Sequence, residues 1–98
     1  MNPVDGGHLP RRPDPGIWEE PEMRAAAAVR DVRAIYREAQ HRGYSQQRIA
    51  ALTGQSQPEV SAILRGRRVT AYDLLVRIAE GLGIPRGYLG LAYTADAA

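Results

Sequence analysis

Hydrophobic positions recur at helical spacing along most of this 98-residue chain, and no stretch shows the alternation of a strand. The first such stripe consists of Ala28, Val32, Ile35 and Ala39. It predicts a helix from Glu22 to His41, because apolar residues three and four positions apart share one helix face. Gly43 follows as a left-handed cap.

Capping signals divide the next part of the chain into two short helices. Ser45 is a good amino-terminal cap for a helix over residues 46–52. A break follows at residues 53–55, and Ser56 with Glu59 three positions later forms a capping box that opens a helix over residues 57–65. Gly66 ends that helix.

Two further helices complete the pattern. Thr70 and Asp73 repeat the capping signal, which predicts a helix over about 71–82 that ends at Gly83. Ile84 and Pro85 open a last short helix that runs through Leu91. The sequence thus predicts an all-α, five-helix domain over residues 22–93.

The two ends of the chain lack periodicity. Residues 1–21 hold five of the seven prolines and are expected to form a flexible, disordered tail, and residues 94–98 a disordered carboxyl terminus. Ile17 and Trp18 are the only large apolar neighbours in the first segment. Two interpretations stay open for them: docking on the domain, or exposure with the rest of the tail.

Composition excludes several classes of site. The chain has no cysteine, and His8 and His41 lie far apart, so we expect no disulfide, no metal site and no cofactor. The longest apolar run, residues 25–29, is far shorter than a membrane span, and no signal peptide is evident. We therefore expect a cytoplasmic protein without membrane contact.

Charge is unevenly distributed. All thirteen basic side chains are arginine, and eleven of them fall in residues 24–98 against six acidic side chains. This moderately basic domain suits a polyanionic partner. Arg30, Arg33 and Arg37 share the spacing of a solvent-exposed helix face, where pairs with acidic neighbours are the simplest interpretation.

The stretch from Gln46 to Arg65 has the pattern of a helix-turn-helix, two short helices joined by a three-residue turn that contains glycine. Gly54 can adopt the positive φ of a tight turn, and Ala50 is small enough for a close helix crossing. No nucleophile elbow or phosphate-binding glycine loop is present, so an enzyme is not expected.

The sequence resembles the Cro and CI repressor-like helix-turn-helix domains, the XRE family of bacterial and phage regulators, over roughly residues 29–92. The motifs that carry the resemblance are Gly43-Tyr44-Ser45-Gln46, Ile49-Ala50, Thr53-Gly54, Ser56-Gln57, Val60-Ser61, Ile63, Gly66-Arg67-Arg68, Leu82-Gly83-Ile84-Pro85 and Leu89. The resemblance implies a lambda-repressor-like fold that binds double-stranded DNA as a transcription regulator, or as its amino-terminal DNA-binding part. The helix over residues 57–65 would lie in the major groove.

The resemblance also assigns roles along the motif. It implies that Gln46 bonds a backbone phosphate and that Ser56, Gln57, Ser61 and Ala62 face the major groove, with Gln57 as the best base reader. By their chemistry, Gln57 pairs with adenine, Arg65 reaches guanine or phosphate, and Ala62 touches only a thymine methyl. Arg48, Arg67 and Arg68 join Gln46 as phosphate clamps. Pro58, where many members have a polar contact, and Tyr44, in place of an aliphatic residue, depart from the family pattern.

Several alternatives stay open. Gln47, Arg48 and Arg65 can also be ordinary solvated side chains, and the whole fold can serve as a protein-interaction module such as an antitoxin. A homodimer would span two half-sites about 34 Å apart. Tyr88, with Leu89 and Leu91, would offer it an association patch. A protein partner or a carboxyl-terminal effector domain is a further option.

Overall fold

The computed structural model describes residues 12–91, and within them it contains five α-helices, two 3₁₀ helices and no strand. The elements are η1 (Pro15–Glu19), α2 (Pro21–Ala28), α3 (Val32–His41), α4 (Gln46–Thr53), α5 (Gln57–Leu64), α6 (Tyr72–Leu82) and η2 (Arg86–Leu89). The predicted all-α class is confirmed. Of the tails expected over residues 1–21 and 94–98, residues 1–11 and 94–98 lie outside the described residues.

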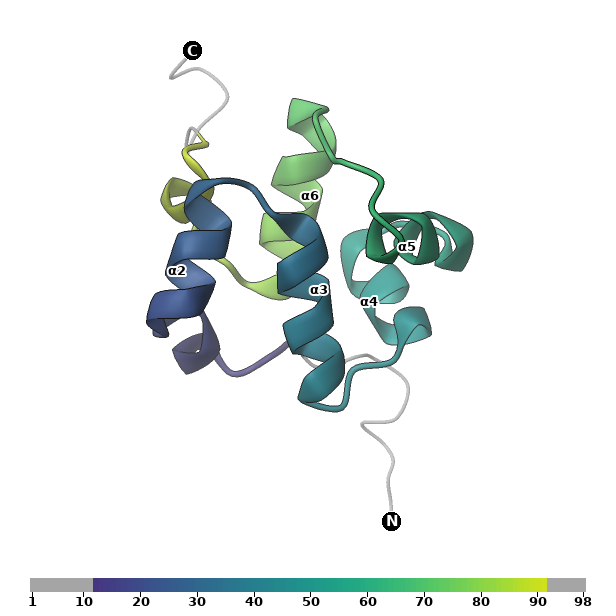
Figure 1. Ribbon diagram of the computed structural model, residues 1–98, viewed down its shortest axis with the longest axis horizontal. Coiled ribbons are helices and arrows are strands. Elements are labelled where there is room, and N and C mark those ends of the chain that lie inside the picture. The colour runs from purple at the N-terminus through teal and green to yellow at the C-terminus, as the bar shows by residue number, and fades with distance from the viewer. Residues whose placement is uncertain (1–11, 92–98) are drawn as a thin grey trace.

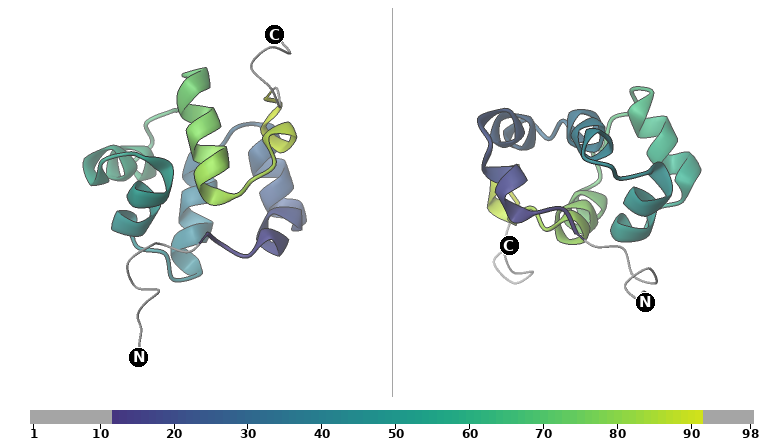
Figure 2. Two further views of the ribbon diagram at one scale, coloured as in Figure 1. Left: turned by 180° about the vertical axis from the view of Figure 1, so that it is seen from behind. Right: turned by 90° about the horizontal axis from the view of Figure 1, so that it is seen from below.

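Helix α3 lies between two groups of elements, with α2 and η2 on one side and α4 and α5 on the other (Figure 1). The views from behind and from below show the same order (Figure 2). Buried side chains from all seven elements form one hydrophobic core. The helix-turn-helix segment therefore lies on the side of the domain away from α2.

The helix predicted over residues 22–41 is wrong as a single element, because it is broken between Ala28 and Val32. Arg30 adopts a left-handed conformation (φ 57°) there, and the Asp31 carboxylate accepts a 3.1 Å hydrogen bond from the Ala34 amide. Asp31 thus starts a new helix instead of continuing the old one. As a result Ala28 is exposed, although the predicted stripe buried it.

The segment before α2 is part of the packed domain. Ile17 and Trp18 are buried, and Trp18 Nε1 donates a 3.1 Å hydrogen bond to the Leu82 carbonyl at the end of α6. This confirms the docking of these two side chains. The sequence placed the start of the folded domain at Glu22, but the packed core already includes Trp18. Its buried indole is held by a residue 64 positions further along the chain, a contact that no local pattern indicates.

Helices α4 and α6 approach each other closely at Gly81. A Cβ atom at this position would overlap the carbonyl oxygen of Leu52 and lie 2.7 Å from its carbonyl carbon. Ala50, earlier in α4, is buried as well. This backbone-to-backbone contact sets the position of α4, and through it that of α5.

The predicted caps hold in the helix-turn-helix but not at α6. Ser45 accepts a 3.1 Å bond from the Arg48 amide, and Ser56 and Glu59 form the complete capping box. Helix α6 instead begins after Ala71 without a side-chain cap, so the role predicted for Thr70 is wrong. The last element is a 3₁₀ turn that ends at Gly90 (φ 71°), shorter than the helix expected there.

Candidate nucleic-acid interface

The turn between α4 and α5 is fixed from two sides. Gly54 has a positive φ, as predicted, with a value of 71°. The Arg77 guanidinium in α6 donates a 2.9 Å hydrogen bond to the Gly54 carbonyl. The next residue, Gln55, is buried although it is polar and lies in a turn. The relative orientation of the two helices therefore depends on groups from outside the motif.

A buried hydrogen-bonded group holds Gln55 in place. The Tyr36 hydroxyl in α3 donates a 2.5 Å bond to Gln55 Oε1, and Thr53 Oγ1 lies 3.1 Å from the same atom. Burial raises the pKa of Tyr36 well above its ordinary value, although its bond to Thr53 acts in the opposite direction. Sequence patterns missed this group, because nothing local indicates that Tyr36 meets a turn residue nineteen positions away.

Helix α5 has one buried and one accessible face. Val60 and Ile63 are buried, whereas Gln57 and Arg65 are exposed. Ser61 and Ala62, expected to face a groove, are half-buried. Gln57, Ser61 and Arg65 are four positions apart and so follow one another along the helix surface.

Arg65 and Ser61 are directly bonded to each other. Arg65 Nη1 donates a 2.6 Å hydrogen bond to Ser61 Oγ one turn earlier. Ser56, at the start of the same helix, accepts a 3.2 Å bond from the Glu59 amide. The Glu59 carboxylate in turn accepts a 2.7 Å bond from the Ser56 amide, and these bonds lower the pKa of Glu59.

The start of α4 offers a second group of polar side chains. Gln46 is half-buried at the first position of the helix, and Arg48 is exposed. The Arg48 guanidinium lies over the Tyr44 ring, 4.6 Å from its centroid. An arginine in this arrangement keeps its charge and its N–H groups for an outside acceptor, while the ring restricts its conformations.

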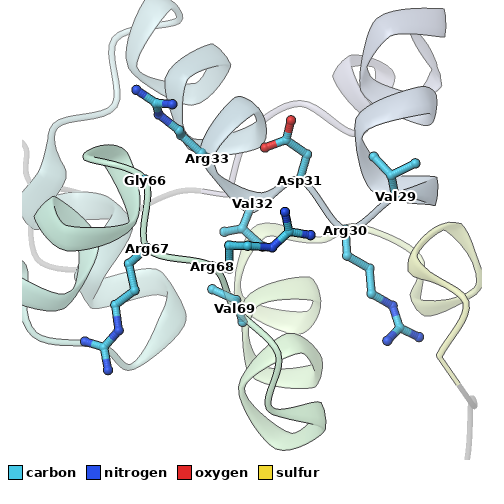
Figure 3. A pocket seen from close by; sticks show the side chains of 9 residues that line it. All are labelled: Val29, Arg30, Asp31, Val32, Arg33, Gly66, Arg67, Arg68 and Val69. Carbon is cyan, nitrogen blue, oxygen red and sulfur yellow. The ribbon is translucent and has the colours of Figure 1, made fainter.

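The loop after α5 borders a cleft of about 400 Å³ whose opposite wall is the start of α3. Arg68 extends across this cleft toward Asp31, whereas Arg67 points away from it (Figure 3). Arg33 extends in another direction and donates a 2.9 Å bond to the Leu64 carbonyl at the end of α5. The guanidinium groups around the cleft therefore diverge and do not converge on one ligand.

Two arginines that the sequence placed on a hydrated face have structural partners instead. Arg33 binds Leu64 as described, and Arg30 Nε donates a 2.8 Å bond to the Leu89 carbonyl. Neither arginine pairs with an acidic neighbour within the described residues. Each instead donates to a carbonyl at the end of a helix, where carbonyls have no partner within the helix. The expectation of local ion pairs is wrong for both.

Ion pairs occupy three of the arginines in the described part of the chain. Arg24 pairs with Glu19, Arg42 with Glu20 and Glu38, and Arg86 with Glu80. No such partner is found within residues 12–91 for the arginines that the sequence assigned to DNA, namely Arg48, Arg65, Arg67 and Arg68. Arg37 and Arg77 also have no ion pair there, so these four arginines are distinguished by their position on α4, at the end of α5 and in the following loop, where Glu59 adds a negative charge that interacts with Arg67.

The association patch expected around Tyr88 is not available. Leu89 and Leu91 are buried in the core. The guanidinium of Arg24 covers the Tyr88 ring, 3.8 Å from its centroid, and the Tyr88 hydroxyl donates a 2.5 Å bond to Glu19. These residues fasten η2 to the amino-terminal segment, so they close the domain instead of exposing an apolar surface.

The described part of the chain lacks two other kinds of feature. No group of three or more His, Asp or Glu side chains there could hold a metal ion. None of the helices in the same part is both long enough and apolar enough to cross a membrane.

Comparison with known proteins identifies a family. A family model described as helix-turn-helix matches residues 34–89, which run from α3 to the end of η2. No curated protein and no solved structure matches the chain. The matched range includes the turn, α5 and the arginine-bearing loop, while η1 and α2 precede it.

Proposed function

The chain belongs to the Cro and CI repressor-like (XRE) helix-turn-helix family of DNA-binding transcription regulators, and on this premise we propose that it binds double-stranded DNA sequence-specifically with α5 in the major groove. The observation that carries the proposal is the division of α5 into a buried apolar face and an accessible polar one. An α-helix with its outer face free is the element that major grooves admit. The family is regulatory and not typically catalytic.

The accessible face of α5 would contact the bases. Gln57 is exposed at the first helical position, and its amide can bond both N6 and N7 of adenine. Arg65 at the other end reaches guanine or phosphate. Ala62 offers a methyl group for contact with thymine, and the Ser56 hydroxyl, which already accepts a capping bond, keeps its proton for an acceptor on DNA.

Residues that flank α5 would bind the DNA phosphates. Gln46 and Arg48 lie at the start of α4, and Arg67 and Arg68 lie in the loop after α5. These two places are separated along the motif, so they would hold the duplex on both sides of the reading helix and set its register. Each neutralised phosphate adds about 0.9 to the dependence of log affinity on log salt.

The first experiment is a selection from random duplex DNA with the 98-residue chain, followed by titration of the enriched site at several salt concentrations. Gln57→Ala should lower discrimination at one base position by roughly 1–3 kcal/mol. Arg67→Ala combined with Arg68→Ala should weaken all sequences alike and reduce the salt slope by about one per lost contact. Arg24→Ala removes the same kind of charge from α2, on the other side of α3, and should leave the slope unchanged.

The form of the selected site distinguishes the arrangements left open. Two symmetric half-sites about 34 Å apart would indicate a dimer, and one isolated half-site a monomer. Equal loss on every sequence for Gln57→Ala would remove it from base reading. No enrichment at all would contradict the proposal and favour a protein-interaction module.

A further inference from the structure

We propose that Ser61 acts on DNA through Arg65, as a positioning residue that holds the guanidinium for one guanine. The inference rests on the proposed function and deepens it, because it names the base and separates two residues that the sequence treated as independent contacts. It starts from the 2.6 Å hydrogen bond that Arg65 Nη1 donates to Ser61 Oγ.

The bond changes where the charge of Arg65 lies. Arg65 is the carboxyl-terminal cap of α5, directly before the Gly66–Arg68 loop. An unrestrained side chain there would sample directions along this loop, where backbone phosphates are the natural acceptors. The bond to Ser61, four positions earlier, brings the guanidinium back by about 6 Å along the helix. It then lies near the middle of α5 and not at its end.

The donors that remain match a guanine edge. A guanidinium has five N–H groups, and Ser61 takes one of them, so four stay available for the O6 and N7 acceptors of guanine. Within the described residues Arg65 has no ion pair that would compete with this contact. Ser61 is half-buried, so its hydroxyl lies close to the helix surface and not far out in solvent.

The same geometry relates the two base readers to each other. Gln57 lies four positions before Ser61, which is about 6 Å along the helix axis. Base pairs follow one another about every 3.4 Å along the duplex. An adenine read by Gln57 and a guanine read by Arg65 should therefore lie about two base pairs apart in the selected site.

The test compares binding of the enriched duplex with its variants at the guanine position. Arg65→Ala should lose the preference for guanine, which a bidentate contact makes about five- to 150-fold. Ser61→Ala should lower it by about threefold to tenfold, the value of one hydrogen bond. Ser61→Thr, which keeps the hydroxyl, should restore it. Gln57→Ala is the matched control, since it should change the preference for adenine only.

A double variant separates positioning from structural effects. In the Arg65→Ala background, Ser61→Ala should cause no further change in base preference, because nothing remains for it to position. Circular dichroism of each variant checks that the helices persist, as expected for alanine at a helical position.

The proposal is overturned if Ser61→Ala weakens binding to all duplexes equally, or if it acts undiminished without Arg65. It is also overturned if Arg65→Ala leaves the guanine preference intact while the unaltered chain still selects a sequence. That last result would leave the proposed function standing, whereas the absence of any preference in the unaltered chain would remove both.

Discussion

Replacing Gly81 by alanine tests the contact that positions the helix-turn-helix on the rest of the domain. The added Cβ would overlap the Leu52 carbonyl oxygen and lie 2.7 Å from its carbonyl carbon and 3.0 Å from Thr53 Cα. All three are backbone atoms of α4, so no side chain can turn aside to make room. Helices α4 and α6 must separate by about 1 Å to reach an ordinary carbon–carbon contact.

The expected cost follows from two opposing effects. Overpacking of a close contact costs about 1–3 kcal/mol, and the upper end applies here because rigid backbone is displaced. Alanine gains about 1 kcal/mol over glycine in a helix interior. The free energy of unfolding should therefore fall by about 2 kcal/mol, which lowers the melting temperature of a domain of this size by about 8–16 °C.

Thermal and urea unfolding, followed by circular dichroism and by the fluorescence of Trp18, measure this change. Trp18 is the single tryptophan and is buried against α6, so it reports on the same region. Gly16→Ala is the matched control, because its Cβ would meet only a side-chain oxygen at 3.4 Å. A Gly81→Ala protein as stable as the unaltered chain would refute the close approach of α4 and α6.

Two further predictions concern groups near α4 and α5. The pKa of Tyr36 is raised by burial above its ordinary value of 10.0, so its contribution to stability is complete below that pH and is lost as pH rises toward the folded-state value. Above pH 10 the free energy of unfolding should therefore fall with pH more steeply than in Tyr36→Phe, by up to about 1.4 kcal/mol per pH unit. Urea unfolding of both proteins at several pH values measures this, and parallel pH profiles would contradict it. Tyr44→Leu removes the ring under Arg48 and should weaken DNA binding by about 0.5–1 kcal/mol, while Tyr44→Phe keeps the ring and should keep the affinity. Equal binding by the two variants would rule out a role for the ring.

Features set by neighbours in the chain could be predicted from the sequence. Ser45 and the Ser56–Glu59 pair form capping bonds to amides three residues away, and Gly54 takes the positive φ that its turn requires. Such interactions need no other part of the fold to form. The helix-turn-helix, its second helix and the all-α class therefore follow from the amino-acid sequence alone.

Features that depend on distant segments could not be predicted. The apolar stripe continued through residues 28–32, yet the helix breaks there, and Arg30 at the break bonds a carbonyl 59 positions away. Trp18 docks on the end of α6, and Arg33 binds the end of α5. Each of these contacts exists only once two remote segments have been brought together.

The same division applies to the candidate interface. The sequence determined which residue types α5 offers, because periodicity separates Val60 and Ile63 from Gln57 and Arg65. Only the tertiary structure decided which arginines form ion pairs and that the buried Tyr36–Gln55 contact holds the turn. Local hydrogen bonding and burial patterns are properties of a chain segment, whereas charge pairing and buried polar contacts are properties of the packed whole.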